Sequence, residues 1–280
     1  MRIVHYVHAE TAAYGLATDA GVARLPLQRP SFDALVDLVA SGRDVAVDTA
    51  VPWEQVTLLP PLTTPGKMLC VGLNFIDHML EAKRPRPERP VLFTRFADTL
   101  VAHGAPLIKP TESDRFDYEG ELAIVIGAHG WKVPPDEALD LIFGYSCYND
   151  ATARDWQYHS SQWTPGKNFP STAAFGPCIL TAAHMPPLSE SIITTRVNGE
   201  ERQKAALDSM IFGLSELLSY ITSFTPLAPG DVIACGTPSG VGNFSDPPRY
   251  LLPGDVVEVE ISEIGTLRNT VVEHADSLVG

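Results

Sequence analysis

The chain has 280 residues, of which 45% are hydrophobic and 19% charged, and its formal net charge is −14 at pH 7. This size and composition suit one large globular domain, or one domain with a small appendage. The acidic balance argues against nucleic acid or an anionic membrane surface as a partner, and no apolar run approaches the roughly 18 residues that span a bilayer.

The N-terminus and the cysteines predict a cytoplasmic protein. Residues 1–8 read as a strand and lack the long apolar core of a signal peptide. The cysteines lie far apart in the sequence and form no C-x-x-C pair: Cys70, Cys147, Cys178 and Cys235. This spacing predicts four buried, reduced thiols rather than a metal cluster or a disulfide framework.

Residues 1–61 are predicted to form a small N-terminal domain of short strands and one helix near residues 31–41. The prolines of residues 59–65 prevent regular structure and mark a boundary, so residues 62–280 form the second domain.

A short strand at residues 67–74 leads into a predicted helical turn at residues 75–82, with Asn74 as its N-cap. His78 and Glu81 are three residues apart, so on a helix they share a face and can hydrogen-bond. A carboxylate beside an imidazole fixes its tautomer and suits it to act as a general base. The alternative is an ordinary His–Glu pair on a helix surface.

Residues 83–90 are basic and interrupted by prolines in an otherwise acidic protein, which indicates an exposed loop. This loop is either a lid that attracts an anionic substrate or a segment that is merely solvated.

Residues 117–126 carry three carboxylates at alternate positions and then an apolar, β-branched run. On a strand, Asp117, Glu119 and Glu121 project to one side together. Three carboxylates on one face of a strand that continues into the core are costly unless something compensates their charge. A bound divalent cation is the simplest compensation, and the alternative is a solvated acidic strand end.

Most of the later chain is predicted to form helices and strands that support the fold, with a few isolated polar residues between them. Helices are predicted at residues 135–141 and 209–223, strands at 142–150 and 256–264, and a hairpin at Asn198-Gly199. Lys167 stands alone in a loop flanked by glycine and proline. A strand at about residue 230 runs into a glycine-rich turn at 236–242, which can aim backbone N–H groups at a carboxylate but lacks a nucleotide-binding pattern.

Six ordered blocks together resemble the fumarylacetoacetate hydrolase family, over about residues 62–280. They are Val71-Gly72-Leu73-Asn74-Phe75-x-x-His78-x-x-Glu81, Asp117-Tyr118-Glu119-Gly120-Glu121-Leu122, Asn149-Asp150-x-x-x-Arg154-Asp155, Gly166-Lys167-x-Phe169, Gly236-Thr237-Pro238-x-Gly240-Val241-Gly242 and Gly265-Thr266-Leu267-Arg268-Asn269. The resemblance is to the branch of acylpyruvases and 2-hydroxyhepta-2,4-diene-1,7-dioate isomerases. It implies an α+β fold, a mixed β-sandwich roll with few helices, and a homodimer.

The resemblance also implies which residues act. The metal ligands would be Glu119, Glu121 and Asp150, with Mg²⁺ the usual ion and Mn²⁺ a substitute, and all-oxygen ligation suits such a hard cation. Asp117, Arg154 and Asp155 would support the site without acting in it. The predicted catalytic residues are His78, Glu81 and Lys167, and the predicted substrate contacts are Thr237, Gly236 and Tyr148.

The predicted activity is Mg²⁺-dependent hydrolysis of a carbon–carbon bond in a small 1,3-diketo acid, such as an acylpyruvate, with release of pyruvate. The same scaffold supports isomerisation of a 2-hydroxymuconate-type diacid and decarboxylation of oxaloacetate. A metal-binding protein without catalysis is the alternative of a different class. A serine or cysteine hydrolase finds no support, because no G-x-S-x-G occurs.

Overall fold

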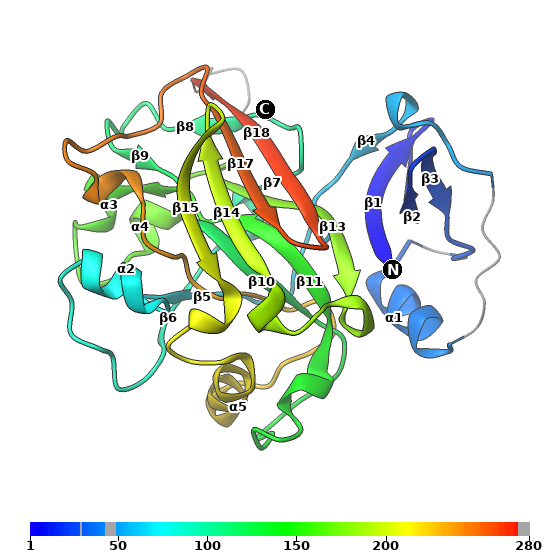
Figure 1. Cartoon of the computed structure of the whole chain (residues 1–280). Helices are drawn as coiled ribbons and strands as arrows, with labels where there is room; N and C mark the ends of the chain where they lie inside the picture. Colours follow the sequence, from blue (N-terminus) through cyan, green and yellow to red (C-terminus); the bar gives the residue numbers. More distant parts are fainter. Residues whose placement is uncertain (29, 43–48, 274–280) are drawn as a thin grey trace.

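A computed structural model describes residues 1–28, 30–42 and 49–273, and within them the chain forms a mixed α+β fold with short helices and extensive sheets (Figure 1). The predicted fold class is confirmed. No helix of the described residues is long and apolar enough to cross a membrane. The four cysteines are free and buried, as the sequence predicts.

The larger sheet has the order β3-β2-β1-β13-β11-β10-β16-β5-β6, with β4 paired to β1 and β7 paired to β13. Its strands are β1 (Arg2–His8), β2 (Thr11–Thr18), β3 (Gly21–Arg24), β4 (Thr57–Leu58), β5 (Met68–Gly72), β6 (Val91–Thr94), β7 (Leu100–Val101), β10 (Gly120–Ile126), β11 (Ile142–Asn149), β13 (Ala173–Thr181) and β16 (Val232–Ala234). Strands β10, β11 and β16 are buried along their whole length.

A second sheet has the order β15-β14-β17-β18-β8, and β12 pairs with β9. These strands are β8 (Leu107–Lys109), β9 (Phe116–Asp117), β12 (Thr152–Ala153), β14 (Ile192–Val197), β15 (Glu200–Ala206), β17 (Val256–Ile261) and β18 (Gly265–Glu273). The strands β14, β17 and β18 lie against β10, β11 and β13 of the larger sheet (Figure 1). Their facing apolar side chains form one core, as in a β-sandwich.

The helices are α1 (Phe32–Ala40), α2 (Ile76–Glu81), α3 (Arg154–Gln157), α4 (Thr164–Lys167) and α5 (Leu214–Phe224). Ser31 caps α1 by accepting the Ala34 N–H, which agrees with the predicted helix near residues 31–41. The predicted helix at 135–141 is reduced to the 3₁₀ turn η3 (Ala138–Leu141). The Asn198-Gly199 hairpin forms as predicted.

Two predictions around α2 and α5 are wrong for one reason. Asn74 does not cap α2: Phe75 is the N-cap residue, and the Asn74 amide instead bonds the backbone of Phe212 and Cys235. Helix α5 begins at Leu214 rather than near 209, because Asn74 accepts the backbone N–H groups of Ile211 and Phe212. A contact across 138 residues therefore outweighs both local signals.

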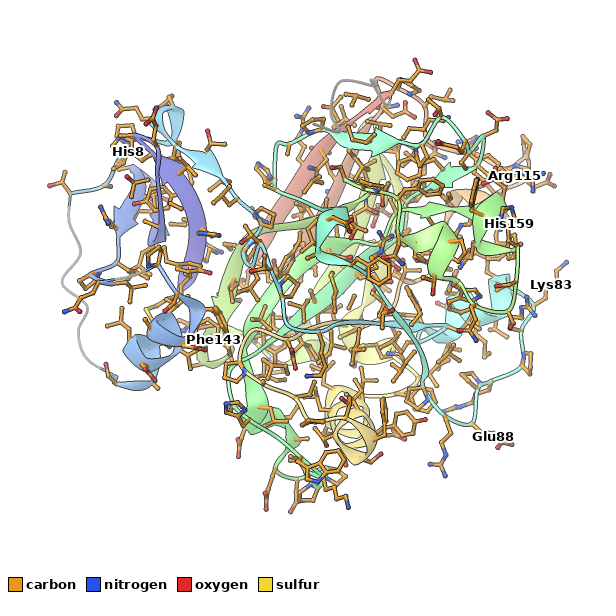
Figure 2. The ribbon with its side chains drawn as sticks, turned by 180° about the vertical axis from the view of Figure 1, so that it is seen from behind. His8, Lys83, Glu88, Arg115, Phe143 and His159 are labelled. Carbon is orange, nitrogen blue, oxygen red and sulfur yellow. The ribbon has the colours of Figure 1, made fainter. Side chains whose placement is uncertain are left out.

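The N-terminal strands continue the larger sheet through β1, which pairs with β13 at Arg2↔Leu180 and Ile3↔Ile179. Helix α1 packs beside it, with the Phe32 and Phe143 rings 5.1 Å apart. His8 of this part lies on the far side of the molecule from Lys83 and Glu88 (Figure 2). A division into two domains at residues 61 and 62 stays a prediction.

Candidate metal centre and active-site cavity

Three acidic residues converge where β10 and β11 pair. Glu119 precedes β10, Glu121 lies on it, and Asp150 directly follows β11. The antiparallel register sets Gly120 opposite Asn149, and the Asp150 N–H donates to the Glu119 carbonyl at 2.8 Å. One carboxylate oxygen from each of the three residues lies within 4.8 Å of the others, and all three side chains are buried. The strand register therefore brings together acids that are 31 positions apart at most, from Glu119 to Asp150.

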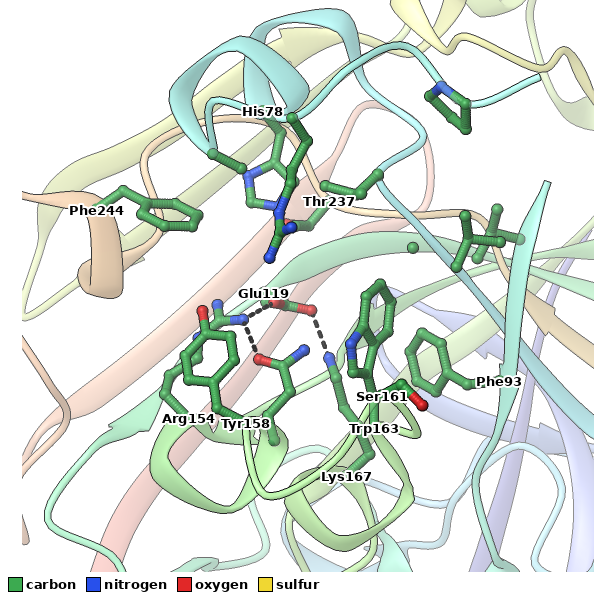
Figure 3. Close-up of a pocket in the computed structure, with 18 of the residues that line it drawn as sticks. His78, Phe93, Glu119, Arg154, Tyr158, Ser161, Trp163, Lys167, Thr237 and Phe244 are labelled. Carbon is green, nitrogen blue, oxygen red and sulfur yellow. Dashed lines mark hydrogen bonds and ion pairs between the residues drawn. The ribbon is translucent and has the colours of Figure 1, made fainter. Parts of the chain in front are cut away.

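Two of these carboxylates are neutralised by buried cations. Lys167 Nζ lies 2.7 Å from Glu119 Oε2, and Arg154 Nη1 lies 2.6 Å from Glu119 Oε1 (Figure 3). Lys167 Nζ also lies 2.5 Å from Asp150 Oδ2. Arg95 Nε donates to Asp150 Oδ1. Burial alone would raise the pKa of Glu119, but Arg154 and Lys167 outweigh it and lower the pKa to about 2. For Lys167, burial favours the neutral amine, yet Asp150 and Glu119 raise its pKa.

The pKa of Glu121 shifts in the opposite direction to that of Glu119. Burial, followed by the neighbouring Asp150 and Glu119 charges, raises its pKa well above the ordinary value. Its Oε2 accepts the Gly236 N–H at 2.9 Å, and none of the residues that the structure describes forms an ion pair with it. A divalent cation among these oxygens would supply the missing positive charge, so the donor set fits a hard metal ion and the triad could hold one.

Asp117 supports this centre from behind. Its carboxylate binds Arg154 Nε at 2.9 Å and accepts the backbone N–H groups of Gly242 and Asn243 at 2.8 and 2.9 Å. Asp117 belongs to β9, whereas Tyr118 and Glu119 lie in the connection to β10, so residues 117–126 are not one continuous strand as predicted. The carboxylate fixes the orientation of Arg154, which in turn holds Glu119.

His78 and Glu81 form the predicted pair on α2. His78 Nδ1 lies 3.1 Å from Glu81 Oε2, and His78 is 6% exposed. Because a carboxylate only accepts hydrogen bonds, Nδ1 carries the proton when the ring is neutral, and Nε2 is left as the basic nitrogen. Glu81 Oε1 accepts the Gly240 N–H at 2.9 Å. The dyad is thus attached to the glycine-rich turn, 159 residues along the chain.

Residues 236–242, hereafter the 236–242 turn, pass beside the triad. Gly236 has φ +100°, and a Cβ atom there would lie 2.7 Å from the Asn74 Cβ, so both the conformation and the close approach require glycine. Thr237 Oγ1 donates to the Gly120 carbonyl at 2.9 Å and accepts from Gln203 Nε2 at 2.8 Å. The turn is therefore fixed directly to the strand that carries Glu121.

A cavity of about 650 Å³ opens above the triad. In the view of Figure 3, Glu119 lies between the His78–Thr237 side and the Lys167–Arg154 side. The cavity is lined by residues from several elements, namely Val71, Gly72, Leu73, His78, Ala82, Arg84, Pro85, Arg86, Pro87, Val91, Phe93, Glu119, Glu121, Arg154, Gln157, Tyr158, Ser160, Ser161, Trp163, Lys167, Thr237 and Phe244. It is enclosed by apolar rings and aliphatic side chains around a charged floor, as small-molecule sites are.

Most of the predicted site residues meet in this cavity. His78, Lys167 and Thr237 line it together with two of the predicted metal ligands, Glu119 and Glu121. Asp150 lies in the floor with no exposed surface, and Glu81 contacts the cavity through His78. Gly236 and Tyr148 do not line the cavity. Tyr148 is fully buried and packs against Phe175, with ring centres 6.1 Å apart, so as a substrate contact it stays a prediction that its position does not support.

Sequence reasoning missed two residues that organise the site. Arg95 follows β6 and bonds Asp150, and the only local signal is a single arginine directly after an apolar strand. Gln203 on β15 bonds Gly120, Thr237 and Pro238. Nothing in its local sequence marks it, because its partners lie 34 to 83 residues away.

Comparison with known proteins settles the family. Residues 67–272 match the model of the fumarylacetoacetate (FAA) hydrolase C-terminal domain. The chain belongs to the fumarylacetoacetate hydrolase family. The match covers the carboxylate triad, helix α2 and the 236–242 turn, so the resemblance seen in the sequence blocks is confirmed.

Three proteins with similar sequences support this assignment to the family. The chain is 40% identical to the mitochondrial oxaloacetate tautomerase fahd2 of Xenopus laevis, over 78% of this chain and 69% of that protein. It is 38% identical to the human mitochondrial oxaloacetate tautomerase FAHD2B, over 79% of this chain and 71% of that protein. A protein of Archaeoglobus fulgidus is 46% identical over 80% of this chain and 85% of its own length.

Solved structures agree over nearly the whole chain. The fumarylacetoacetate hydrolase of Exiguobacterium antarcticum has a TM-score of 0.86 at 34% identity and covers 98% of this chain and 100% of its own. The 2-hydroxyhepta-2,4-diene-1,7-dioate isomerase of Mycobacterium marinum has a TM-score of 0.81 at 29% identity, with 98% and 99% covered. This protein is therefore an enzyme of a family whose named relatives include tautomerases, isomerases and a hydrolase.

Proposed function

We propose that this enzyme is a metal-dependent keto–enol tautomerase or isomerase of a small 2-oxo acid. The observation that carries the proposal is that His78, paired with Glu81, lines the same cavity as Glu119 and Glu121 of the carboxylate triad. The names of the relatives support proton transfer as the reaction, since two of them are oxaloacetate tautomerases and one structural relative is a dioate isomerase.

The chemistry needs a base and a site for negative charge. A divalent cation held by Glu119, Glu121 and Asp150 would bind the carboxylate and 2-oxo oxygens of the substrate and acidify its C3 protons. His78 Nε2 takes a proton from C3, and the C3 electron pair forms the carbon–carbon double bond of the enol. The protonated imidazole then gives the proton to the enol oxygen. Bond making and proton transfer balance without any other reactant.

The remaining residues act by charge and orientation. Glu81 holds the Nδ1 proton of His78 and stabilises the imidazolium while it carries the second proton. Lys167, buried in the cavity floor, places a positive charge beside the oxygens where negative charge develops. Phe93, Trp163 and Phe244 surround the cavity with apolar surface, which limits water near the transferred proton.

The second candidate is the predicted hydrolysis of a carbon–carbon bond in an acylpyruvate-like acid. The same dyad favours it, because His78 could deprotonate a water that attacks the distal carbonyl, after which the bond breaks and pyruvate leaves. Oxaloacetate decarboxylation and a metal-binding role without catalysis remain the further alternatives. Simple decarboxylation leaves the dyad without a task.

Assays with the purified chain and Mg²⁺ separate these activities. For tautomerisation, the enol absorbance of freshly dissolved oxaloacetate should decay faster with enzyme than without, with no pyruvate formed. Hydrolysis of an acylpyruvate would release pyruvate and a carboxylic acid, and decarboxylation of oxaloacetate would release pyruvate and CO₂. Pyruvate formation from an acylpyruvate without any effect on enol decay would replace the first proposal by the second.

Two variants test the roles. We expect His78→Ala to lose most of the turnover, about 10²–10⁴-fold, while it still binds metal, because His78 is not one of the three clustered carboxylates and its side chain pairs with Glu81 instead. We expect Glu119→Ala to lose metal binding itself. Wild-type tautomerisation by the His78 variant would remove the dyad from the mechanism. Mg²⁺ or Mn²⁺ as the ion and a homodimer as the assembly stay predictions from the family resemblance.

A further inference from the structure

The charged residues at the floor of the cavity are buried, whereas those at its rim are exposed. The floor residues Glu119, Glu121 and Lys167 are 5%, 2% and 1% exposed. The rim includes Arg84 and Arg86, which are exposed and line the same cavity. Both come from residues 82–90, hereafter the 82–90 segment, which follows α2 directly. A substrate bound by its 2-oxo acid end at the floor would point its other end towards this rim.

The cations of the floor and of the rim differ in their partners. In the floor, Arg95, Arg154 and Lys167 each form an ion pair with a buried carboxylate. At the rim, neither Arg84 nor Arg86 forms an ion pair with any residue in the described part of the chain. Two guanidinium groups in the wall of a cavity, both without a carboxylate of the protein, are available to an anionic ligand.

Arg84 is also held in a fixed place relative to the base. The Arg84 N–H donates to the Met79 carbonyl at 3.1 Å, and the Lys83 N–H donates to the Leu80 carbonyl at 3.0 Å. Lys83 between them has φ +52°. This is the Schellman pattern that ends a helix, with a left-handed residue and a crossed pair of hydrogen bonds. The backbone of Arg84 therefore belongs to the same rigid unit as His78 and Glu81.

Not every cation of the segment faces the cavity. Lys83 and Arg89 do not line it, and Arg89 instead lines a separate hollow with Phe212 and Tyr220. Figure 2 shows Lys83 and Glu88 at the outer edge of the molecule. Within this segment, Arg84 and Arg86 can therefore touch a substrate in the cavity, whereas Lys83 and Arg89 can only attract it at a distance.

We propose that Arg84 and Arg86 are specificity-determining residues that bind a second carboxylate at the far end of the substrate. The enzyme then selects 2-oxo dicarboxylic acids over 2-oxo acids with an uncharged tail. This inference rests on the proposed function in one respect, namely that the 2-oxo acid end occupies the floor. Because Arg84 is fixed to α2, occupation of the rim also holds His78 over the substrate.

The test measures binding rather than turnover. The probes are 2-oxoglutarate and 2-oxopentanoate, which have the same chain length and differ in a terminal carboxylate or methyl group. Their dissociation constants are measured by calorimetry with Mg²⁺ present, for wild type, Arg84→Gln, Arg86→Gln and the double variant. Arg89→Gln is the matched control, since it removes the same charge from the same segment outside the cavity.

We expect wild type to bind 2-oxoglutarate at least about tenfold more tightly, as one charge-assisted hydrogen bond provides. The double variant should lose this preference with an unchanged dissociation constant for 2-oxopentanoate, and Arg89→Gln should behave as wild type. An unchanged preference in the double variant would overturn the proposal, as would an equal loss in Arg89→Gln. Selective binding without tautomerase activity would refute the proposed reaction alone and leave the rim assignment intact.

Discussion

Glu81 joins α2, the helix that carries His78, to the 236–242 turn beside the carboxylate triad, because its Oε1 accepts the Gly240 N–H at 2.9 Å while Oε2 accepts from His78. Both oxygens of a carboxylate accept hydrogen bonds, so this one side chain can accept both protons at once. One residue thereby sets the tautomer of His78 and the position of α2 against the 236–242 turn.

Glu81→Gln separates these two tasks. The amide oxygen can keep the Gly240 contact, and the amide N–H₂ then donates to His78 Nδ1. This selects the ring tautomer with its proton on Nε2, which cannot act as a base. We expect kcat to fall about 10²–10³-fold with little change in Tm, measured by enol decay and thermal unfolding. Glu81→Ala should lower both kcat and Tm, and a Gln variant with wild-type kcat would show that the tautomer does not matter.

A second prediction concerns Glu121 and metal removal. In the metal-free protein its carboxylate is buried and forms no ion pair with any residue in the described part of the chain, and burial with the Asp150 and Glu119 charges raises its pKa. We expect Glu121→Gln in EDTA to be as stable as wild type or more stable, because the amide carries no charge. With Mg²⁺ the order should reverse, since wild type gains stability from the bound ion and the variant gains little.

Thermal unfolding with and without Mg²⁺ measures this pair of effects. Glu216→Gln, which removes a carboxylate from the first turn of α5, is a charge-matched control that should respond to Mg²⁺ like wild type. A Glu121→Gln variant that gained as much stability from Mg²⁺ as wild type would remove Glu121 from the ligand set.

The Schellman cap behind Arg84 gives a prediction about stability. Lys83 adopts φ +52°, a conformation that a side chain disfavours by about 1 kcal/mol and glycine does not. We expect Lys83→Gly to raise the free energy of unfolding by about 1 kcal/mol and Tm by about 2 °C. Lys83→Gln removes the charge without relieving the backbone, so it should leave Tm unchanged. Equal Tm values for the glycine and glutamine variants would contradict the assignment of strain to Lys83.

The carboxylate triad could be predicted from the sequence by combining a strand pattern with the family blocks. Glu119 and Glu121 alternate before an apolar strand, and Asp150 ends another strand, so strand periodicity and the family blocks identified them together. The His78–Glu81 pair follows from helix spacing in the same way. Glu119 with Glu121, and His78 with Glu81, are each close in the sequence, whereas Asp150 was added by the family blocks.

What the sequence could not provide depends on distant contacts. Asparagine is a residue type that favours helix N-caps, yet the side-chain amide of Asn74 forms hydrogen bonds with backbone groups of Phe212 and Cys235. Tyr148 lies on the strand that leads to Asp150, and the register sets it opposite Glu121 and beside Phe175, but its ring is fully buried and does not line the cavity. Contacts between residues so far apart in the chain produce no periodic pattern in the sequence.

Gln203 is the site residue whose role depends most on such contacts. It is 1% exposed, its Oε1 accepts the Gly120 N–H at 2.9 Å, and its Nε2 donates to Thr237 Oγ1 and the Pro238 carbonyl at 2.8 Å each. It thereby joins β15 of the second sheet to β10, which carries Glu121, and to the 236–242 turn. Gln203→Met keeps the length of the side chain but leaves these buried groups without partners.

We expect Gln203→Met to lower the free energy of unfolding by about 3 kcal/mol, from two or more unsatisfied buried groups. Urea unfolding measures this, with Gln55→Met as a control at an exposed glutamine. Because the turn also positions Thr237 in the cavity wall, KM for the 2-oxo acid should rise at temperatures where the variant remains folded. Gln203→Glu can still accept from Gly120 but cannot donate to Pro238, so it should not restore KM. If Gln203→Met retained wild-type KM, the turn would be positioned without this residue.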